Sequence, residues 1–331
     1  MSFQHIGIVG AGGWGTALAL LLHEQRKPIT LWGHNSDEVR QFAAAGENTM
    51  YLKGVSLPRE FQWTGELERL GDCDLILIVT PSKATREVAA ALSRVTLAED
   101  AVLLSCTKGV ERGSGKRMSE ILAEHFPSHA IAALSGPSHA EEVARRQPTA
   151  VSVACAERPI AERLQRAFST SYFRAYTNDD VAGVELGGAL KNIFALAAGV
   201  SDGLGLGDNS KAALVTRALA EMIRLGTALG GRRETFSGLS GIGDLMVTCF
   251  SQHSRNRRVG ERLGRGEAIA EITSSMQMVA EGVPTTYSAH ECARRLGVET
   301  PITDQIHSLL EGSVSAGEVM ANLLSRDPRP E

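Results

Sequence analysis

Aromatic side chains are scarce in this 331-residue chain, where Trp, Tyr and Phe together make up 5%. The formal net charge is -4, and no cluster of Lys and Arg is interleaved with aromatic residues. A surface that binds nucleic acid needs a basic patch, and one that binds single strands adds rings on which the bases stack. We therefore expect no nucleic-acid partner.

Paired cysteines and clustered histidines are missing as well. The cysteines are odd in number and never form a CxxC pair: Cys73, Cys106, Cys155, Cys249 and Cys292. This pattern is typical of a reducing compartment and excludes a zinc knuckle. Pro127 breaks any helix between His125 and His129, so these histidines offer no metal site, and we expect no metal.

Long hydrophobic runs are also absent. The longest, WGTALALLL at residues 14–22, is too short to span a bilayer. The opening MSFQHIGIVG enters a strand without a basic region or a signal-type cleavage site. These features favour a cytoplasmic protein without membrane insertion.

What the chain does contain, in its first half, is an alternation of short apolar runs with helix-like segments. Such alternation implies parallel strands joined by right-handed crossovers, hence a doubly wound α/β sheet. The expected strands are IGIVG, ITLWG, DLILIVT, AVLLSC, AIAAL, AVSVA and SYFRAYT, and the helix-like segments include residues 14–24, 84–93 and 116–125. Strand signals stop near TNDDVAG, where Asn178 or Asp179 could cap a helix. We predict a sheet domain over residues 1–180 and an all-helical domain over 181–331.

The first strand runs into a glycine-rich turn. In HIGIVGAGGWGTALALLL, residues Gly10, Gly12 and Gly15 form a G-x-G-x-x-G at the start of a helix. The first glycine permits the turn, the second lets a pyrophosphate approach, and the third lets the helix pack on the strand. The alternative is a plain tight turn. In this β/α context the motif predicts a dinucleotide-binding domain of Rossmann type.

The end of the second strand bears on the choice of cofactor. NAD-specific sites usually place a carboxylate there to accept from the ribose 2′-hydroxyl. Gly33, His34 and Asn35 stand at this point, and Asp37 comes later. With no carboxylate to repel a 2′-phosphate, the sequence favours NADP(H), or use of both NADP(H) and NAD(H).

Two later strands also end in polar or small residues. AVLLSCTKG places Lys108 after one strand, and ALSGPSHAEEVA places Gly136, Ser138 and Ala140 after another. Ligands of open parallel sheets bind at the carboxyl ends of the strands. These residues are therefore expected to share a cleft with the glycine turn.

The helical half contains one isolated cation. Lys191 lies in the apolar stretch VELGGALKNIFALAAGV, with no carboxylate three or four residues away on its own helix. Gly187 and Gly188 precede it by one turn, which suggests a close approach to the helix backbone and, for a reactive lysine, access for substrate. The alternative is a lysine whose stem packs on apolar surface while its ammonium reaches water.

Two further motifs follow. The small residues of GLSGIGDL precede Asp244, so the backbone can come close to another group there. In SQHSRNRRVG, Ser254, Arg255 and Asn256 stand at a helix start and could bind a phosphate monoester. The two arginines that follow, Arg257 and Arg258, are interpreted as a solvated basic face.

These motifs, in this order and over nearly the whole chain, closely resemble the bacterial NAD(P)-dependent glycerol-3-phosphate dehydrogenases. The resemblance implies that Lys191 is the proton donor and acceptor for the substrate's C2 oxygen. It implies substrate contacts at Lys108, Gly136, Ser138, Lys191, Asp244, Ser254, Arg255 and Asn256. It implies cofactor contacts at Gly10, Gly12, Gly13, Trp14, Gly15, His34, Lys108, Ala140, Arg255, Val279 and Glu281. Gly13 stands where the family usually has serine, and His34 where arginine is frequent.

The resemblance implies the interconversion of sn-glycerol 3-phosphate and dihydroxyacetone phosphate, which feeds phospholipid synthesis. Because the family usually forms homodimers, the resemblance also implies a homodimer. Lys191 could deliver the proton if burial or a nearby cation such as Lys108 lowers its pKa, with Asp244 orienting it. Two alternatives remain open from the residues: a related hydroxy-acid dehydrogenase of the same two-domain plan, and a dinucleotide-sensing regulator without catalysis.

Overall fold

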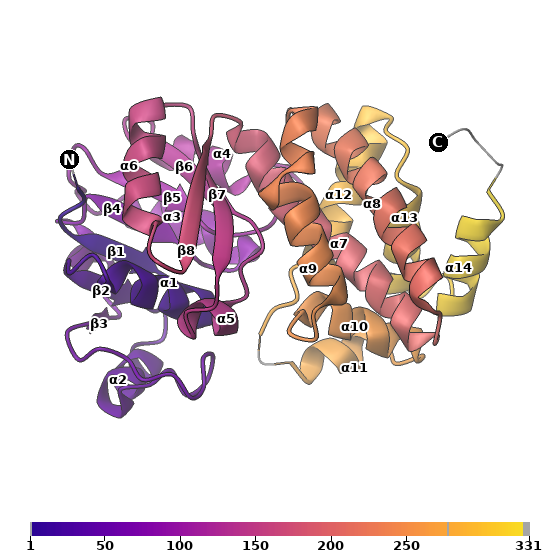
Figure 1. Ribbon diagram of the computed structural model, residues 1–331, viewed down its shortest axis with the longest axis horizontal. Helices are drawn as coiled ribbons and strands as arrows, with labels where there is room; N and C mark the ends of the chain where they lie inside the picture. Colours follow the sequence, from indigo (N-terminus) through magenta and orange to yellow (C-terminus); the bar gives the residue numbers. More distant parts are fainter. Residues whose placement is uncertain (1, 277, 327–331) are drawn as a thin grey trace. The chain divides into compact units, whose positions relative to one another are not determined.

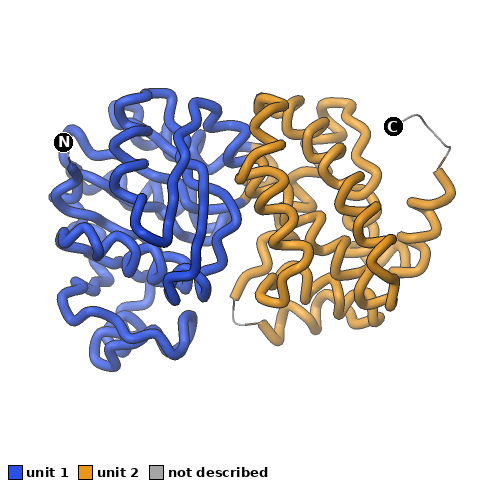
Figure 2. Tube along the Cα trace, viewed as in Figure 1, with its two compact units in different colours: residues 1–108, 116–185 blue, residues 109–115, 186–331 orange. Residues whose placement is uncertain are grey.

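The computed structural model describes residues 2–276 and 278–326, which divide into two compact units. Unit 1 comprises Met1–Lys108 and Lys116–Glu185, and unit 2 comprises Gly109–Gly115 and Leu186–Glu331 (Figure 2). The change of unit thus falls a few residues after the predicted boundary at 180. The sequence had not indicated that residues 109–115 belong with the helical half.

Unit 1 is built on one eight-stranded sheet of order β3-β2-β1-β4-β5-β6-β7-β8 (Figure 1). Its strands are β1 (Ile6–Val9), β2 (Ile29–Trp32), β3 (Gln62–Thr64), β4 (Leu75–Ile78), β5 (Val102–Ser105), β6 (Ala130–Ser135), β7 (Thr149–Cys155) and β8 (Phe173–Asn178). Its helices are α1 (Gly13–His23), α2 (Ser36–Ala45), α3 (Thr85–Leu92), α4 (Met118–His125), α5 (Ala140–Ala144) and α6 (Arg158–Phe168). The predicted doubly wound α/β fold is confirmed.

The register of the central strands brings their carboxyl ends to one edge. Val9 pairs with Trp32 on one side and with Ile78 on the other, and Ile78 pairs with Ser105. The turns that follow β1, β2, β4 and β5 therefore leave the sheet at the same level. This is the edge at which open parallel sheets bind ligands.

Two features of the sheet differ from the prediction. The short edge strand β3 was not expected, and β7 runs antiparallel to β6. The connecting helix α5 has five residues, so it is about 8 Å long at 1.5 Å per residue, whereas the six residues of β6 span about 20 Å. Because α5 is too short to carry the chain back along the sheet, β7 starts at the edge where β6 ends.

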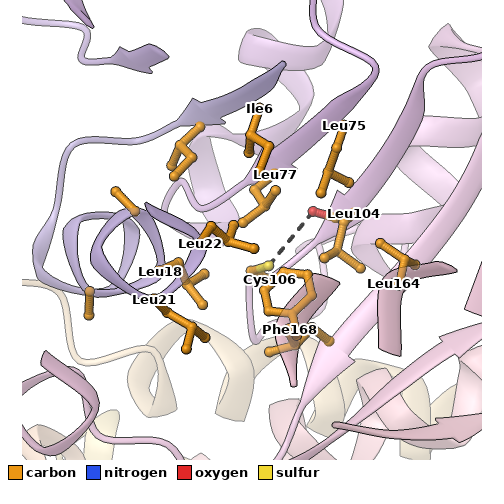
Figure 3. Packing of buried hydrophobic residues seen from close by; sticks show 14 of the residues in the cluster. Ile6, Leu18, Leu21, Leu22, Leu75, Leu77, Leu104, Cys106, Leu164 and Phe168 are labelled. Atoms are coloured by element: carbon orange, nitrogen blue, oxygen red, sulfur yellow. Dashed lines mark hydrogen bonds between the residues drawn. The ribbon is translucent and has the colours of Figure 1, made fainter. Parts of the chain in front are cut away.

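Apolar side chains cover both faces of the sheet, which is why its strands appear as continuous hydrophobic runs. On one face, α1 and α6 pack on the central strands, and Figure 3 labels Ile6, Leu18, Leu21, Leu22, Leu75, Leu77, Leu104, Cys106, Leu164 and Phe168 of this core. On the other face, Met118, Ile121 and Leu122 of α4 pack with Ile76 and Leu103. This double burial holds the turn between β1 and α1 in place.

Every regular element in the described part of unit 2 is helical, as predicted. The first helix, α7 (Val181–Gly203), begins in unit 1 and continues into unit 2. The others are α8 (Asp208–Ala228), α9 (Asp244–Phe250), α10 (Arg255–Gly264), α11 (Ile269–Ser274), α12 (Gly282–Leu296), α13 (Pro301–Leu310) and α14 (Ala316–Leu324). A π-helical turn, η4 (Leu239–Gly243), leads directly into α9.

Helix α7 is long and apolar enough to cross a membrane by length and composition alone, which counting uninterrupted apolar runs had not revealed. However, 89% of its most apolar window is buried inside the protein, as in the core helix of a globular domain. Its single lysine is therefore placed in the interior of the fold.

Candidate active site

The three motif glycines of the β1–α1 turn have distinct structural roles. Gly10 has φ +129°, and a Cβ there would lie 2.7 Å from the carbonyl oxygen of Val79. A Cβ on Gly15 would lie 1.9 Å from the oxygen of Gly10, so only glycine lets α1 pack against the turn. Apart from Gly12 and its two chain neighbours, no described heavy atom lies within 4 Å of the Cβ position of Gly12. The turn thus has the open backbone that a pyrophosphate needs at a helix N-terminus.

Gly13 is required by a neighbouring loop. A Cβ on Gly13 would lie 2.6 Å from the carbonyl oxygen of Tyr51. The buried Asn48 fastens this loop to the turn: its oxygen accepts from Tyr51 N at 3.0 Å, and its amide donates to Ala11 O at 3.0 Å and to Thr16 Oγ1 at 2.8 Å. A serine at position 13 would therefore clash with the 48–51 loop. The sequence interpretation missed Asn48, which lies in no recognised motif.

The end of β2 presents an imidazole and no carboxylate. His34 is exposed, and Asn35 caps α2 by accepting from Asp37 N at 3.0 Å and Glu38 N at 3.3 Å. Asp37 pairs with Arg40 within the helix. Its carboxylate is thus engaged within α2, and His34 is the exposed side chain next to the end of β2.

Three predicted substrate residues of unit 1 meet at one carbonyl group. The Nζ of Lys108 and the hydroxyl of Ser138 each donate to Gly136 O at 2.9 Å. Gly136 has φ +144°, and a Cβ there would lie 2.9 Å from the Cα of Val151. A glycine is therefore needed to aim this carbonyl at the lysine.

The remaining predicted residues of unit 1 adjoin the glycine turn. Ala140 is the first residue of α5, and its Cβ lies 3.9 Å from the Cβ position of Gly13. Trp14 lies in the first turn of α1 and packs against the sheet core. The start of α5 and the cofactor turn are thus immediate neighbours.

In unit 2, Lys191 is buried and paired. Its Nζ lies 2.9 Å from Asp244 Oδ1 and donates to Thr248 Oγ1 at 2.6 Å. Lys191 is 6% exposed and Asp244 1%. The interpretation of Lys191 as a lysine that reaches water is therefore wrong, because its ion partner comes from α9 instead of its own helix.

Thr248, which the sequence interpretation missed, completes this group. Its hydroxyl donates to the backbone oxygen of Asp244 one turn earlier, at 2.6 Å, while accepting from Lys191. The next residue, Cys249, is also buried, and burial raises the pKa of its thiol to about 12. Cys249 is thus a neutral neighbour of the Lys191–Asp244 pair.

Gly187 explains how α9 reaches α7. A Cβ on Gly187 would lie 2.5 Å from the carbonyl oxygen of Ser240, in the η4 turn. A Cβ on Gly241 in that turn would lie 2.0 Å from the oxygen of Phe236. The expectation that Gly187 gives substrate access was wrong, since protein backbone fills that space. The glycines allow the turn before Asp244 to pack on the lysine helix.

The start of α10 is bonded to α7 and α12. Ser254 caps α10, with its Oγ accepting from Arg257 N at 3.2 Å. The side chain of Asn256 donates to Asn192 Oδ1 at 2.8 Å and accepts from Gly282 N at 2.9 Å. Asn192 directly follows the lysine, so the α10 turn is linked to the Lys191 segment.

Around this turn, Arg255 is exposed at the first position of α10, whereas Arg257 is largely buried and its Nε donates to Asp202 at 2.6 Å. The interpretation of Arg257 as a solvated cation was therefore wrong. Val279 lies half-buried before α12, and Glu281 is the N-cap of that helix. The predicted site residues thus form two groups, one within each unit.

Comparisons with known proteins match the two halves of the chain to one family. Residues 5–161 match the family model described as NAD-dependent glycerol-3-phosphate dehydrogenase N-terminus, and residues 180–321 match the corresponding C-terminus. A glycerol-3-phosphate dehydrogenase [NAD(P)+] of Chlorobium luteolum is 46% identical over 99% of both chains. One from Bacillus cereus is 47% identical over 97% of this chain and 95% of its own. The crystal structure of the Coxiella burnetii glycerol-3-phosphate dehydrogenase superposes with a TM-score of 0.94 at 40% identity, covering 98% of this chain and 99% of that one.

Proposed function

Because this chain belongs to the NAD-dependent glycerol-3-phosphate dehydrogenase family, we propose that Lys191 supplies the proton in its reaction. The chain is an NAD(P)-dependent oxidoreductase that interconverts sn-glycerol 3-phosphate and dihydroxyacetone phosphate. Full-length relatives at this identity favour that activity over a hydroxy-acid dehydrogenase or a non-catalytic sensor.

The cofactor NAD(P)H, when bound, supplies the hydride for C2 of the substrate. Gly10, Gly12 and Gly15 would hold its pyrophosphate against the amides of α1. The other predicted contacts of unit 1 adjoin that turn or the strand ends next to it. This part of the proposal rests on the open backbone at Gly12.

The burial and pairing of Lys191 suit a proton donor to the substrate's oxygen. Asp244, 2.9 Å away, favours the ammonium form of the lysine, which is the form needed when the C2 oxygen gains negative charge. Asp244 and Thr248 direct two of its three N–H bonds, so the ammonium is held in one orientation. In the oxidation direction the same nitrogen would take the proton back.

The start of α10 is proposed as the phosphate site. Backbone amides at a helix N-terminus and the guanidinium of Arg255 together suit a phosphate monoester. Ser254 and Asn256 flank Arg255 and are fixed by hydrogen bonds, so the turn is formed before the substrate arrives. Lys108, Gly136 and Ser138 are the proposed substrate contacts of unit 1, joined through the Gly136 carbonyl.

The catalytic role of Lys191 is tested by Lys191→Met, which keeps an apolar stem and removes the amine. We expect normal NADPH binding by fluorescence titration and a loss of kcat of at least about a hundredfold for dihydroxyacetone phosphate reduction. Lys27→Met, at a half-buried lysine in the loop before β2 that donates to Gln4 Oε1, is the matched control and should leave kcat unchanged. A near-normal kcat in Lys191→Met would refute the role.

The cofactor preference is a further proposal. With His34 at the end of β2 and no carboxylate directly there, NADPH should be used at least as well as NADH. Parallel steady-state assays with the two cofactors test this. A strong preference for NADH would contradict it.

We also propose the cellular setting that the family resemblance implies: a cytoplasmic homodimer that supplies glycerol 3-phosphate for phospholipid synthesis. Five buried, unpaired cysteines support a reducing compartment. Light scattering of the purified protein tests the dimer. Complementation of a glycerol 3-phosphate auxotroph tests the supply of phospholipid precursor.

A further inference from the structure

We propose that Asp202 is a positioning residue for the phosphate group of the substrate. It lies near the end of α7 and would act through Arg257, holding the first turns of α10 at a set position relative to Lys191. This inference rests on the proposed phosphate site at the start of α10.

The carboxylate of Asp202 joins three helices of unit 2. Its Oδ2 accepts from Arg257 Nε, in the first turn of α10, at 2.6 Å. Its Oδ1 lies 2.7 Å from the Nζ of Lys211, in the first turns of α8. The side chains of Asp202, Arg257 and Lys211 are 16%, 15% and 11% exposed, so this cluster is largely desolvated. Neither the family resemblance nor the proposed chemistry assigns a task to Asp202.

Arg257 connects this cluster to the proposed phosphate turn. Its backbone N–H donates to Ser254 Oγ, the cap of α10, while its side chain is held by Asp202. Because both its backbone N–H and its side chain are held, Arg257 fixes the orientation of the first turn of α10. The guanidinium of Arg257 is paired with Asp202 and largely buried, whereas Arg255 and Arg258 in the same turn are exposed.

The packing of α10 on α7 makes that orientation specific. A Cβ on Gly199 would lie 2.0 Å from Arg257 O, and one on Gly260 would lie 2.0 Å from Leu196 O. Further along, a Cβ on Gly203 would lie 2.2 Å from Glu261 O. The two helices thus meet backbone to backbone, with no side chain between them to adjust the separation.

The phosphate turn is consequently tied to α7 at two points. Asn256 donates to Asn192 beside Lys191, and Arg257 donates to Asp202 toward the end of the same helix. Because a helix is rigid over this length, α7 would set the separation of the reacting amine from the phosphate. In a phosphorylated three-carbon substrate, the carbonyl that the amine must reach lies at a characteristic distance from the phosphate. This arrangement would therefore select substrates by the distance from carbonyl to phosphate.

The test compares two substrates that differ only in the phosphate, dihydroxyacetone phosphate and dihydroxyacetone. For Asp202→Asn we expect kcat/KM for the phosphorylated substrate to fall at least about tenfold, mainly through KM, and the Ki of inorganic phosphate to rise similarly. For dihydroxyacetone, kcat/KM should change less than about threefold. Arg158→Ala, which removes an exposed ion pair with Glu162 on α6, is the control and should change kcat/KM for neither substrate.

A second variant guards against loss of folding. Arg257→Met leaves Asp202 paired with Lys211 and should show the same selective loss, and the double variant should be no worse than the more affected single one, since both remove the same contact. Circular dichroism confirms the fold of each variant. Equal losses for both substrates would mean that Asp202 only stabilises the protein, and additive losses would mean that it does not act through Arg257; either result overturns the inference.

Arg255→Leu separates this inference from the phosphate site itself. If Arg255→Leu removes the preference for the phosphorylated substrate and Asp202→Asn does not, the positioning role of Asp202 is refuted and the proposed phosphate site is supported. If Arg255→Leu leaves the preference intact, the proposed site fails, and the inference with it.

Discussion

The Nζ of Lys191 on α7 lies 2.9 Å from Oδ1 of Asp244 on α9, and both side chains are almost fully buried. An ion pair removed from water is stabilising only while both partners are present, because one alone is an uncompensated buried charge. The pair therefore links the protonation state of the lysine to a single carboxylate.

Asp244→Asn keeps the shape of this carboxylate and removes its charge. Without it the buried ammonium loses its proton at lower pH, so we expect the pH above which reduction declines to move to lower values. At pH 8, kcat should fall at least about tenfold while NADPH binding is retained. The measurement is a pH–rate profile, with Asp208→Asn, at an exposed carboxylate on α8, as control. An unshifted profile would contradict the role of Asp244.

Gly13→Ser tests the contact between the cofactor turn and the 48–51 loop. The added Cβ would lie 2.6 Å from Tyr51 O, so the anchored loop must move. We expect a loss of about 1–3 kcal/mol in the free energy of unfolding, together with a raised KM for NADPH. Urea titrations measure the first and steady-state kinetics the second. Gly317→Ser, at a position where an added Cβ would meet no described atom outside the backbone of its own helix, should change neither the free energy of unfolding nor the KM for NADPH.

His307 should make stability depend on pH. Burial, and then the neighbouring His290, lower its pKa from the ordinary 6.5, against the opposing effect of the carboxylates Glu311, Asp304 and Glu291. The unfolded chain then binds the proton more tightly, so the stabilising contribution is complete above about pH 6.5 and is lost as pH falls through the folded pKa. Between pH 7.5 and 5.5, the Tm of the protein should fall more than that of His307→Phe. Parallel curves would refute this.

The five cysteines should resist alkylation in the folded state. All are buried, and burial raises the pKa of the Cys73 and Cys249 thiols to about 12 and that of Cys106 still further. At pH 8 only about one in ten thousand of the first two would be thiolate. Mass spectrometry after iodoacetamide treatment should find no label in buffer and five in urea. Rapid labelling of Cys249 in buffer would show that the Lys191 region opens.

Much of unit 1 could be predicted because its signals are local. The glycine spacing at residues 10–15 specifies a turn whose φ and packing requirements only glycine meets, and the structure has both. Lys108 and Ser138 come after strands of one sheet, whose carboxyl ends must meet at one edge, and both side chains bond to Gly136. The direction of β7 was missed because it depends on the length of α5, which the periodicity of the strands does not encode.

The sequence by itself determined the alternation of strands and helices in unit 1 apart from β3, where the dinucleotide turn lies and that Lys191 has no ion partner on its own helix. Only the tertiary structure decided what that lysine meets. Asp244, Thr248 and the backbone of Ser240 come from segments distant in the chain, as does the Asp202 partner of Arg257. Hydrophobic periodicity specifies which face of a helix is buried. It does not specify which polar group from another segment packs against that face. The identity of that polar group follows from how closely the glycines allow two helices to approach.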